Sequence, residues 1–300
     1  MALLDGKTFA DERLLDAAGH VLHAYYKAPL TTARLNQKAV VISGEELRPA
    51  LDLVEGMNQR LEGAAKEAFF PLYVDYMCVK VAMDEGYSPV MVAMGADYTK
   101  ADLGWDCGAC GFPTCSEFNR YSKDHAGPGS LCMGPSCVWK SMDHGIAVDY
   151  ACAAAHELNV ENRILSTFGL LTLLLGYMDG VSAVWALALG PQTDAWWYSR
   201  ASLAKWLDPS TLDGMLRSSY NHHFQMFSTK TRPQVKGHGK WWERPAEYTR
   251  GIGPDPEYDA HQGQVKQALF ETLAEVQPKV AALRAKKAET LQKGAPSNER

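Results

Sequence analysis

Five of the seven cysteines lie between residues 107 and 137, and three of them follow the spacing C-x2-C-x4-C. The five are Cys107, Cys110, Cys115, Cys132 and Cys137. Closely spaced thiolates on a loop are the ligands that a soft metal centre requires. Gly108 and Gly111 allow the backbone of such a loop to curl tightly, because glycine has no Cβ. The chain must therefore fold so that this segment forms one site.

Several kinds of site fit these cysteines. A [4Fe–4S] cluster takes four cysteine thiolates, so Cys132 or Cys137 would have to complete the first three. Zinc is the main alternative, although its sites more often use paired cysteines or mixtures of cysteine and histidine. The third alternative is a set of buried thiols. Cys78 and Cys152 lie in apolar surroundings and are expected in the core.

The composition describes a globular protein, with 46% hydrophobic and 22% charged residues, a net charge of −5 and a pI near 6.0. This charge does not favour nucleic acid or an anionic membrane as the main partner. The N-terminal residues show no secretion signal, and the clustered, odd number of cysteines does not suggest a disulfide framework. We therefore expect a cytoplasmic protein.

Residues 168–190 are strongly apolar, but Asp179 and Gly180 interrupt them, which predicts a buried helix followed by a buried strand and no membrane span.

Hydrophobic periodicity predicts helices and strands in mixed order. The expected helices cover 9–27, 45–69, 146–158 and 165–175, the expected strands cover 39–42, 89–95 and 181–189, and 71–83 fits either. This order indicates an α/β (α+β) domain with helices on the faces of a central sheet. We expect residues 1–200 to form this core, with the cysteine segment at about 104–140. Residues 201–300 would form an extended arm and an amphipathic helix at 262–292, bent at Pro278.

The cysteine segment resembles known iron–sulfur proteins. The spacing from Cys107 to Cys132 is similar to that of the ferredoxin-like [4Fe–4S] domain in corrinoid iron–sulfur proteins and the Rnf complex, which implies Cys132 as the fourth ligand. Over 15–200 the chain resembles the DUF2148 family of uncharacterised ferredoxin domain-containing proteins of anaerobes, through residues 106–118, 134–147 and 159–164. That resemblance implies Cys107, Cys110, Cys115 and Cys137 as ligands, and we favour this set.

A second resemblance is to nitroreductases. Residues 28–37 and 44–47 are similar to a flavin-contacting segment of that fold, and 143–147 and 186–191 to its later half. The resemblance implies a helix-flanked mixed sheet with the cluster loop inserted, a homodimer, and FMN near Lys27, Thr31, Thr32, Arg34 and Asn36. Residues 20–27 contain no arginine, unlike the phosphate-binding segment of nitroreductases, so Lys27, Arg34 or Arg163 would have to bind the phosphate.

Together these observations predict an iron–sulfur redox protein of anaerobic metabolism that transfers electrons through one [4Fe–4S] cluster. A bound flavin would make it a reductase of a small substrate. The alternatives are a non-enzymatic electron-transfer or assembly subunit, which needs a redox partner protein, and a structural zinc protein. For His144, seven residues after Cys137, we expect a helix-capping or solvent-facing position.

Overall fold

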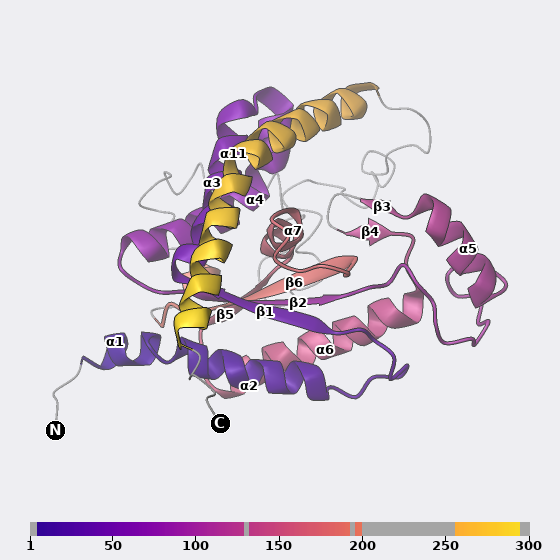
Figure 1. Ribbon diagram of the computed structural model, residues 1–300, viewed down its shortest axis with the longest axis horizontal. Helices are drawn as coiled ribbons and strands as arrows, with labels where there is room; N and C mark the ends of the chain where they lie inside the picture. Colours follow the sequence, from indigo (N-terminus) through magenta and orange to yellow (C-terminus); the bar gives the residue numbers. More distant parts are fainter. Residues whose placement is uncertain (1–4, 129–131, 193–195, 200–255, 295–300) are drawn as a thin grey trace, which may run out of the picture.

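The computed structural model describes residues 5–128, 132–192, 196–199 and 256–294. A four-stranded sheet lies at its centre, with strand order β1-β2-β6-β5. Its strands are β1 (Lys38–Ser43), β2 (Val90–Ala96), β6 (Ala183–Leu189) and β5 (Asn162–Leu165). Each neighbouring pair is antiparallel, so this sheet differs from the mixed sheet expected from the sequence. The α/β class with helices on both faces is confirmed (Figure 1).

Helices cover both faces of the sheet. One face carries α2 (Leu14–Lys27) and α6 (Val138–Glu157), and the other carries α3 (Arg48–Arg60), α4 (Gly63–Asp84) and α7 (Ser166–Leu174) (Figure 1). Side chains along β2 alternate between the two cores, since successive residues of a strand point to opposite faces. Met91 and Ala93 pack with the second group of helices, and Val92 and Met94 pack with the first.

The remaining elements are short or peripheral. They are α1 (Gly6–Asp11), the 3-10 turn η1 (Gly44–Leu47), α5 (Cys115–His125), the two-residue strands β3 (Gly127–Pro128) and β4 (Met133–Gly134), and α8 (Trp196–Ser199). Helix α5 and the β3–β4 pair lie together at one end of the sheet, beside the segment that carries the cysteines (Figure 1).

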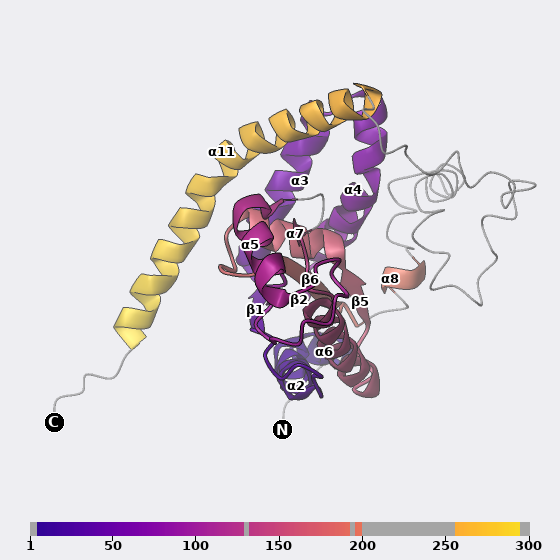
Figure 2. The same ribbon diagram turned by 90° about the vertical axis from the view of Figure 1, so that its right-hand side faces the viewer.

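Helix α11 (Pro256–Gly294) runs along the outside of α3 and is bent, with Pro278 inside it (Figure 2). Ala268, Val276 and Val280 are buried against the core on this side of the sheet. Lys279 reaches Asp52 of α3 at 2.5 Å. The C-terminal amphipathic helix predicted from the sequence is therefore confirmed. Residues 201–255 of the predicted arm lie outside the described residues, so the division of the chain after residue 200 stays a prediction.

Two expected helices are each divided in the structure, and one strand was not expected. The helix expected at 9–27 is interrupted between α1 and α2, and the single helix expected at 45–69 is η1 and α3 followed by the start of α4. Leu61 is extended and Gly63 has a positive φ of 53°, which ends one helix and turns the chain into the next. Residues 162–165 form strand β5 before α7 begins. The apolar stretch at 168–190 is α7 followed by β6, as expected, and within the described ranges no helix has the length and apolarity needed to cross a membrane.

Candidate metal centre

The first three cysteines lie where the chain leaves the sheet. Residues 97–114, which we call the cysteine loop, connect the end of β2 to α5. Tyr98 at the start of this loop donates its backbone N–H to Ser182 Oγ at 2.8 Å, just before β6. Ser182 in turn donates its own N–H to the carbonyl oxygen of Ala96 at 3.0 Å. The loop therefore begins from a point that is fixed to two central strands.

Left-handed backbone conformations shape the cysteine loop. Gly108 and Gly111 have φ values of 72° and 86°, and the N–H of Gly111 donates to the carbonyl oxygen of Gly108 at 3.0 Å. Asp106 also has a positive φ, 48°, and its Oδ1 accepts the N–H of Cys115 at 2.7 Å. The bond to Asp106 brings Cys115 back toward Cys107, the first cysteine of the loop. The glycines predicted to let this loop curl do so, since both adopt a φ that other residues rarely take.

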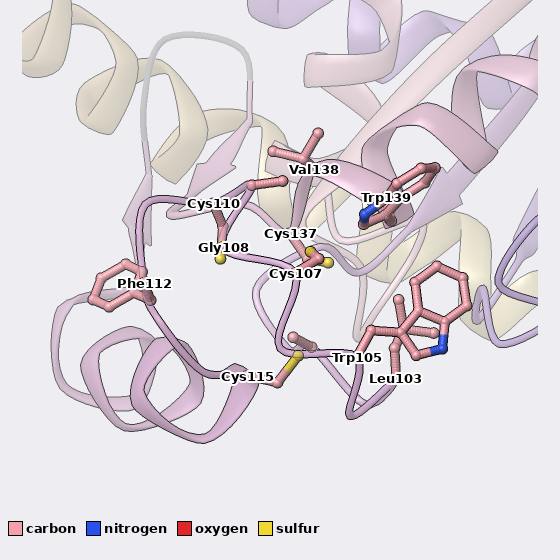
Figure 3. A pocket seen from close by; sticks show the side chains of 12 residues that line it. Leu103, Trp105, Cys107, Gly108, Cys110, Phe112, Cys115, Cys137, Val138 and Trp139 are labelled. Carbon is pink, nitrogen blue, oxygen red and sulfur yellow. The ribbon is translucent and has the colours of Figure 1, made fainter.

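Four cysteines line one cavity at the end of the sheet. Cys107, Cys110, Cys115 and Cys137 border about 320 Å³ of space that is partly open to solvent. Figure 3 shows their sulfur atoms turned toward the space between them. Cys107 is exposed at the mouth of the cavity, Cys110 and Cys115 are half-buried, and Cys137 is buried with 5% exposure. Cys132 is exposed next to β4 and is not among the residues that line this cavity.

Two of these thiols sit at helix N-termini. Cys115 is the first residue of α5, and Cys137 is the N-cap residue of α6. The N-terminus of a helix carries a partial positive charge, which stabilises a thiolate or another anion placed there. The remaining walls are aliphatic and aromatic, from Ala101, Leu103, Trp105, Phe112, Val138 and Trp139. The donor set and the surroundings therefore fit an anionic, thiolate-bound group. Within the described ranges, no three His, Cys, Asp or Glu side chains converge on a single-ion site.

The part of the cysteine loop that precedes Cys107 makes polar contacts with α5 and α6. Asn119 of α5 donates to the carbonyl oxygen of Ala101 at 2.6 Å and accepts its N–H at 2.7 Å. The ammonium group of Lys140 on α6 is buried and lies 3.1 Å from the carboxylate of Asp102. Arg34 donates to the carbonyl oxygen of Asp102 at 2.7 Å. Arg34, which the sequence predicted near a flavin, therefore supports the cysteine loop in the structure.

The other residues of the predicted flavin site meet a different partner. The carboxylate of Asp143 on α6 accepts the backbone N–H of Thr31 at 2.9 Å and that of Thr32 at 2.8 Å, and it also accepts the Thr32 hydroxyl. These donors are thus engaged by an anion that belongs to the chain itself. Lys27 and Asn36 are exposed, and Arg163 donates to the carbonyl oxygen of Trp197 at 3.1 Å.

His144 is buried, contrary to the helix-capping or solvent-facing position expected. It has no exposed surface, and its Nδ1 is hydrogen-bonded to the hydroxyl of Tyr98. The ring of Tyr25 packs against it at a centroid distance of 6.0 Å. Burial lowers the pKa of His144 to about 4, so the imidazole is neutral at neutral pH. The expected position was wrong because the side of α6 that carries His144 packs against α2 and the sheet. No local sequence pattern shows this packing.

The comparisons with known proteins agree with this site in part. A family model described as "Uncharacterized protein containing a ferredoxin domain (DUF2148)" matches residues 133–199. The matched segment includes Cys137 and all of α6, whereas the cysteine loop precedes it. The ferredoxin domain in the family's description points to iron–sulfur electron transfer.

A relative is similar to a larger part of the chain. An uncharacterized protein of Archaeoglobus fulgidus is 27% identical over 177 residues, which is 59% of this chain and 86% of that protein. No solved structure matches the chain.

Proposed function

We propose that Cys107, Cys110, Cys115 and Cys137 hold a [4Fe–4S] cluster and that the protein transfers single electrons. The observation that carries the proposal is the cavity that these four thiols share, although Cys137 comes from a segment separate from the other three. Four cysteine thiolates are the usual ligand set of such a cluster. The ferredoxin domain named for the family that matches residues 133–199 supports the same centre.

The surrounding residues would determine how the centre behaves. When bound, a [4Fe–4S] cluster supplies reversible one-electron transfer. The apolar walls would limit the access of water to it, and the N-termini of α5 and α6 would stabilise its negative charge. Cys107 and the neighbouring Trp105 are exposed at the mouth of the cavity. A redox partner protein would therefore exchange electrons on this side.

The arrangement favours a multinuclear group over zinc. A structural zinc site needs four sulfur atoms at about 2.3 Å from one ion. In the part of the chain that the structure describes, no three of these side chains converge closely enough to hold a single ion. Zinc sites also tend to use two cysteine pairs, and this loop contributes three ligands from one run.

Bound FMN, a homodimer and a cytoplasmic, anaerobic setting remain predictions from the sequence. The donors of Thr31 and Thr32, which the flavin hypothesis requires, are bonded to Asp143, so a phosphate would have to replace that carboxylate. The non-enzymatic electron-transfer subunit therefore needs fewer additional assumptions than the flavin-dependent reductase.

Anaerobic purification with quantitation of iron, sulfide, zinc and FMN tests the proposal. We expect about four iron and four sulfide per chain, with a dithionite-reducible absorption band. Cys115→Ser should lose the iron, whereas Cys152→Ser, which changes a half-buried cysteine of α6 outside the cavity, should retain it. Zinc without iron in the wild-type protein would overturn the proposal, and FMN in stoichiometric amount would favour the reductase.

A further inference from the structure

Trp139 lines the cavity, and the environment of its indole nitrogen is unusual. It follows Cys137 by two residues in the first turn of α6 and lines the cavity with the four cysteines. Its ring packs edge to face against Trp105, with the centroids 5.7 Å apart and the planes at 75°. This contact fixes the orientation of the indole, so the direction of its N–H is also fixed.

The indole nitrogen of Trp139 is buried and has no hydrogen-bond partner in the part of the chain that the structure describes. Leaving a buried donor unpaired costs about 1–3 kcal/mol, so such groups are rare and call for an explanation. Two other buried indoles among the described residues are paired. Trp196 donates to the carbonyl oxygen of Cys78 at 3.2 Å, and Trp197 donates to that of Gly190 at 2.9 Å.

The direction of the indole identifies the acceptor. In Figure 3 the nitrogen of Trp139 lies on the side of its ring that faces the cysteine sulfurs, whereas the nitrogen of Trp105 is turned away from them. A water molecule would be a poor partner, because it needs two to four polar neighbours. The twelve residues that line the cavity include no side chain with an oxygen atom.

We propose that Trp139 Nε1 donates an N–H···S hydrogen bond to the iron–sulfur group held by the four cysteines. The inference rests on the proposed function and adds a residue that tunes the potential of the same site. A hydrogen bond to sulfur is stronger when the group carries more negative charge, so it favours the reduced form and raises the reduction potential. Trp139 would therefore tune the reduction potential of the centre without being one of its ligands.

Trp139→Phe and Trp105→Phe form a matched pair for the test. Both remove an indole from the same wall and leave a phenyl ring, but only the first removes the nitrogen that faces the sulfurs. In redox titrations of the reconstituted proteins, Trp139→Phe should lower the potential, with a three- to tenfold change in the equilibrium between oxidised and reduced forms. At 59 mV per tenfold for one electron, this is about 30–60 mV. Trp105→Phe should change the potential by much less, and equal shifts in the two variants would overturn the inference.

A second measurement keeps the inference testable if Trp139→Phe does not retain the centre. Protein grown with indole-15N tryptophan and reduced for pulsed electron paramagnetic resonance should show a 15N coupling to the centre in the wild type. Trp105→Phe should keep the coupling. Its absence from wild-type protein that contains about four iron atoms per chain would overturn the inference while leaving the proposed function intact. Wild-type protein without iron would overturn the proposed function itself, and with it this inference.

Discussion

The backbone N–H of Cys137 donates a hydrogen bond to the carbonyl oxygen of Tyr98 at 2.8 Å. Tyr98 begins the cysteine loop, and Cys137 caps the helix that follows the β3–β4 pair. The bond therefore joins the two separate segments that supply thiols to the cavity. It also holds the buried Cys137 at the cavity that the first three cysteines line, a placement that Cys132 does not have.

The first prediction concerns the fourth cysteine. Cys137→Ser should reduce the iron content of anaerobically purified protein to a small fraction of the wild-type value, because a hydroxyl is a much poorer ligand than a thiolate. Cys132→Ser should retain the iron and the absorption spectrum, since its side chain is exposed outside the cavity. Loss of iron from the Cys132 variant alone would show that the other resemblance, with Cys132 as ligand, is the correct one.

Much of the fold could be predicted from hydrophobic patterns. The buried runs at 90–96 and 183–189 form the central strands β2 and β6, and the amphipathic pattern of the C-terminal helix forms α11. Strand β5 was missed because it has only four residues, three of them half-buried, and pairs with β6 alone. The break between α3 and α4 was missed because Leu61 and Glu62 favour a helix locally, and tertiary packing overrides that preference.

The candidate site could be predicted only in its chemistry. Cysteine spacing was enough to identify the loop, because ligands close in sequence must lie close in space. The residues that support the loop come from distant segments. Thr32 and Asp143 are separated by 111 positions, and the contact between Lys140 and Asp102 joins a helix to the loop. Such contacts leave no local pattern, although a lysine and an aspartate in the first turns of an otherwise apolar helix face could have been a signal.

Asp106 provides a prediction about the stability of the cysteine loop. Asp106→Ala removes the acceptor of the Cys115 N–H and places alanine at a φ of 48°, which asparagine and aspartate tolerate better. A loss of about 1 kcal/mol should make the release of iron to a chelator about fivefold faster. Asp106→Asn keeps an oxygen acceptor and should release iron at close to the wild-type rate. Equal rates for the alanine variant and the wild type would contradict this role.

Asp143 should be important for folding independently of any cofactor. Asp143→Ala leaves the backbone N–H groups of Thr31 and Thr32 without their acceptor, and Thr32 is buried. We expect the free energy of unfolding to fall by about 2–4 kcal/mol in urea denaturation followed by circular dichroism. The control is Asp149→Ala, an exposed aspartate of the same helix, which should change stability by about 0.5 kcal/mol or less. Similar losses in both variants would mean that the contact to the loop contributes little.

His144 predicts a dependence of stability on pH. Its pKa falls from 6.5 to about 4 on folding because of burial, so the unfolded chain binds the proton more readily. Stability should therefore be fully present above pH 6.5 and fall as the pH decreases from 6.5 toward 4.

Between pH 7.5 and 5.5 this histidine should cost about 1 kcal/mol of stability. Comparing the urea midpoints of the wild type and His144→Gln at both pH values isolates this contribution from other titrating groups. The variant should lose less stability on acidification. The same pH dependence in both proteins would show that His144 does not titrate with a lowered pKa.

Gly169 of α7 predicts the largest effect of a single methyl group. A Cβ at this position would lie 2.0 Å from the carbonyl oxygen and 2.7 Å from the carbonyl carbon of Val184. These are backbone atoms of β6, which is paired on both sides and cannot move aside. Gly169→Ala should therefore push α7 off the sheet and cost about 3 kcal/mol of unfolding free energy. Gly19→Ala on α2, where no heavy atom of the described chain lies within 4 Å of the new Cβ, should instead stabilise the protein by about 0.5–1 kcal/mol. Chemical denaturation of the two variants would show opposite changes, and a neutral Gly169→Ala would mean that α7 and β6 are not packed this closely.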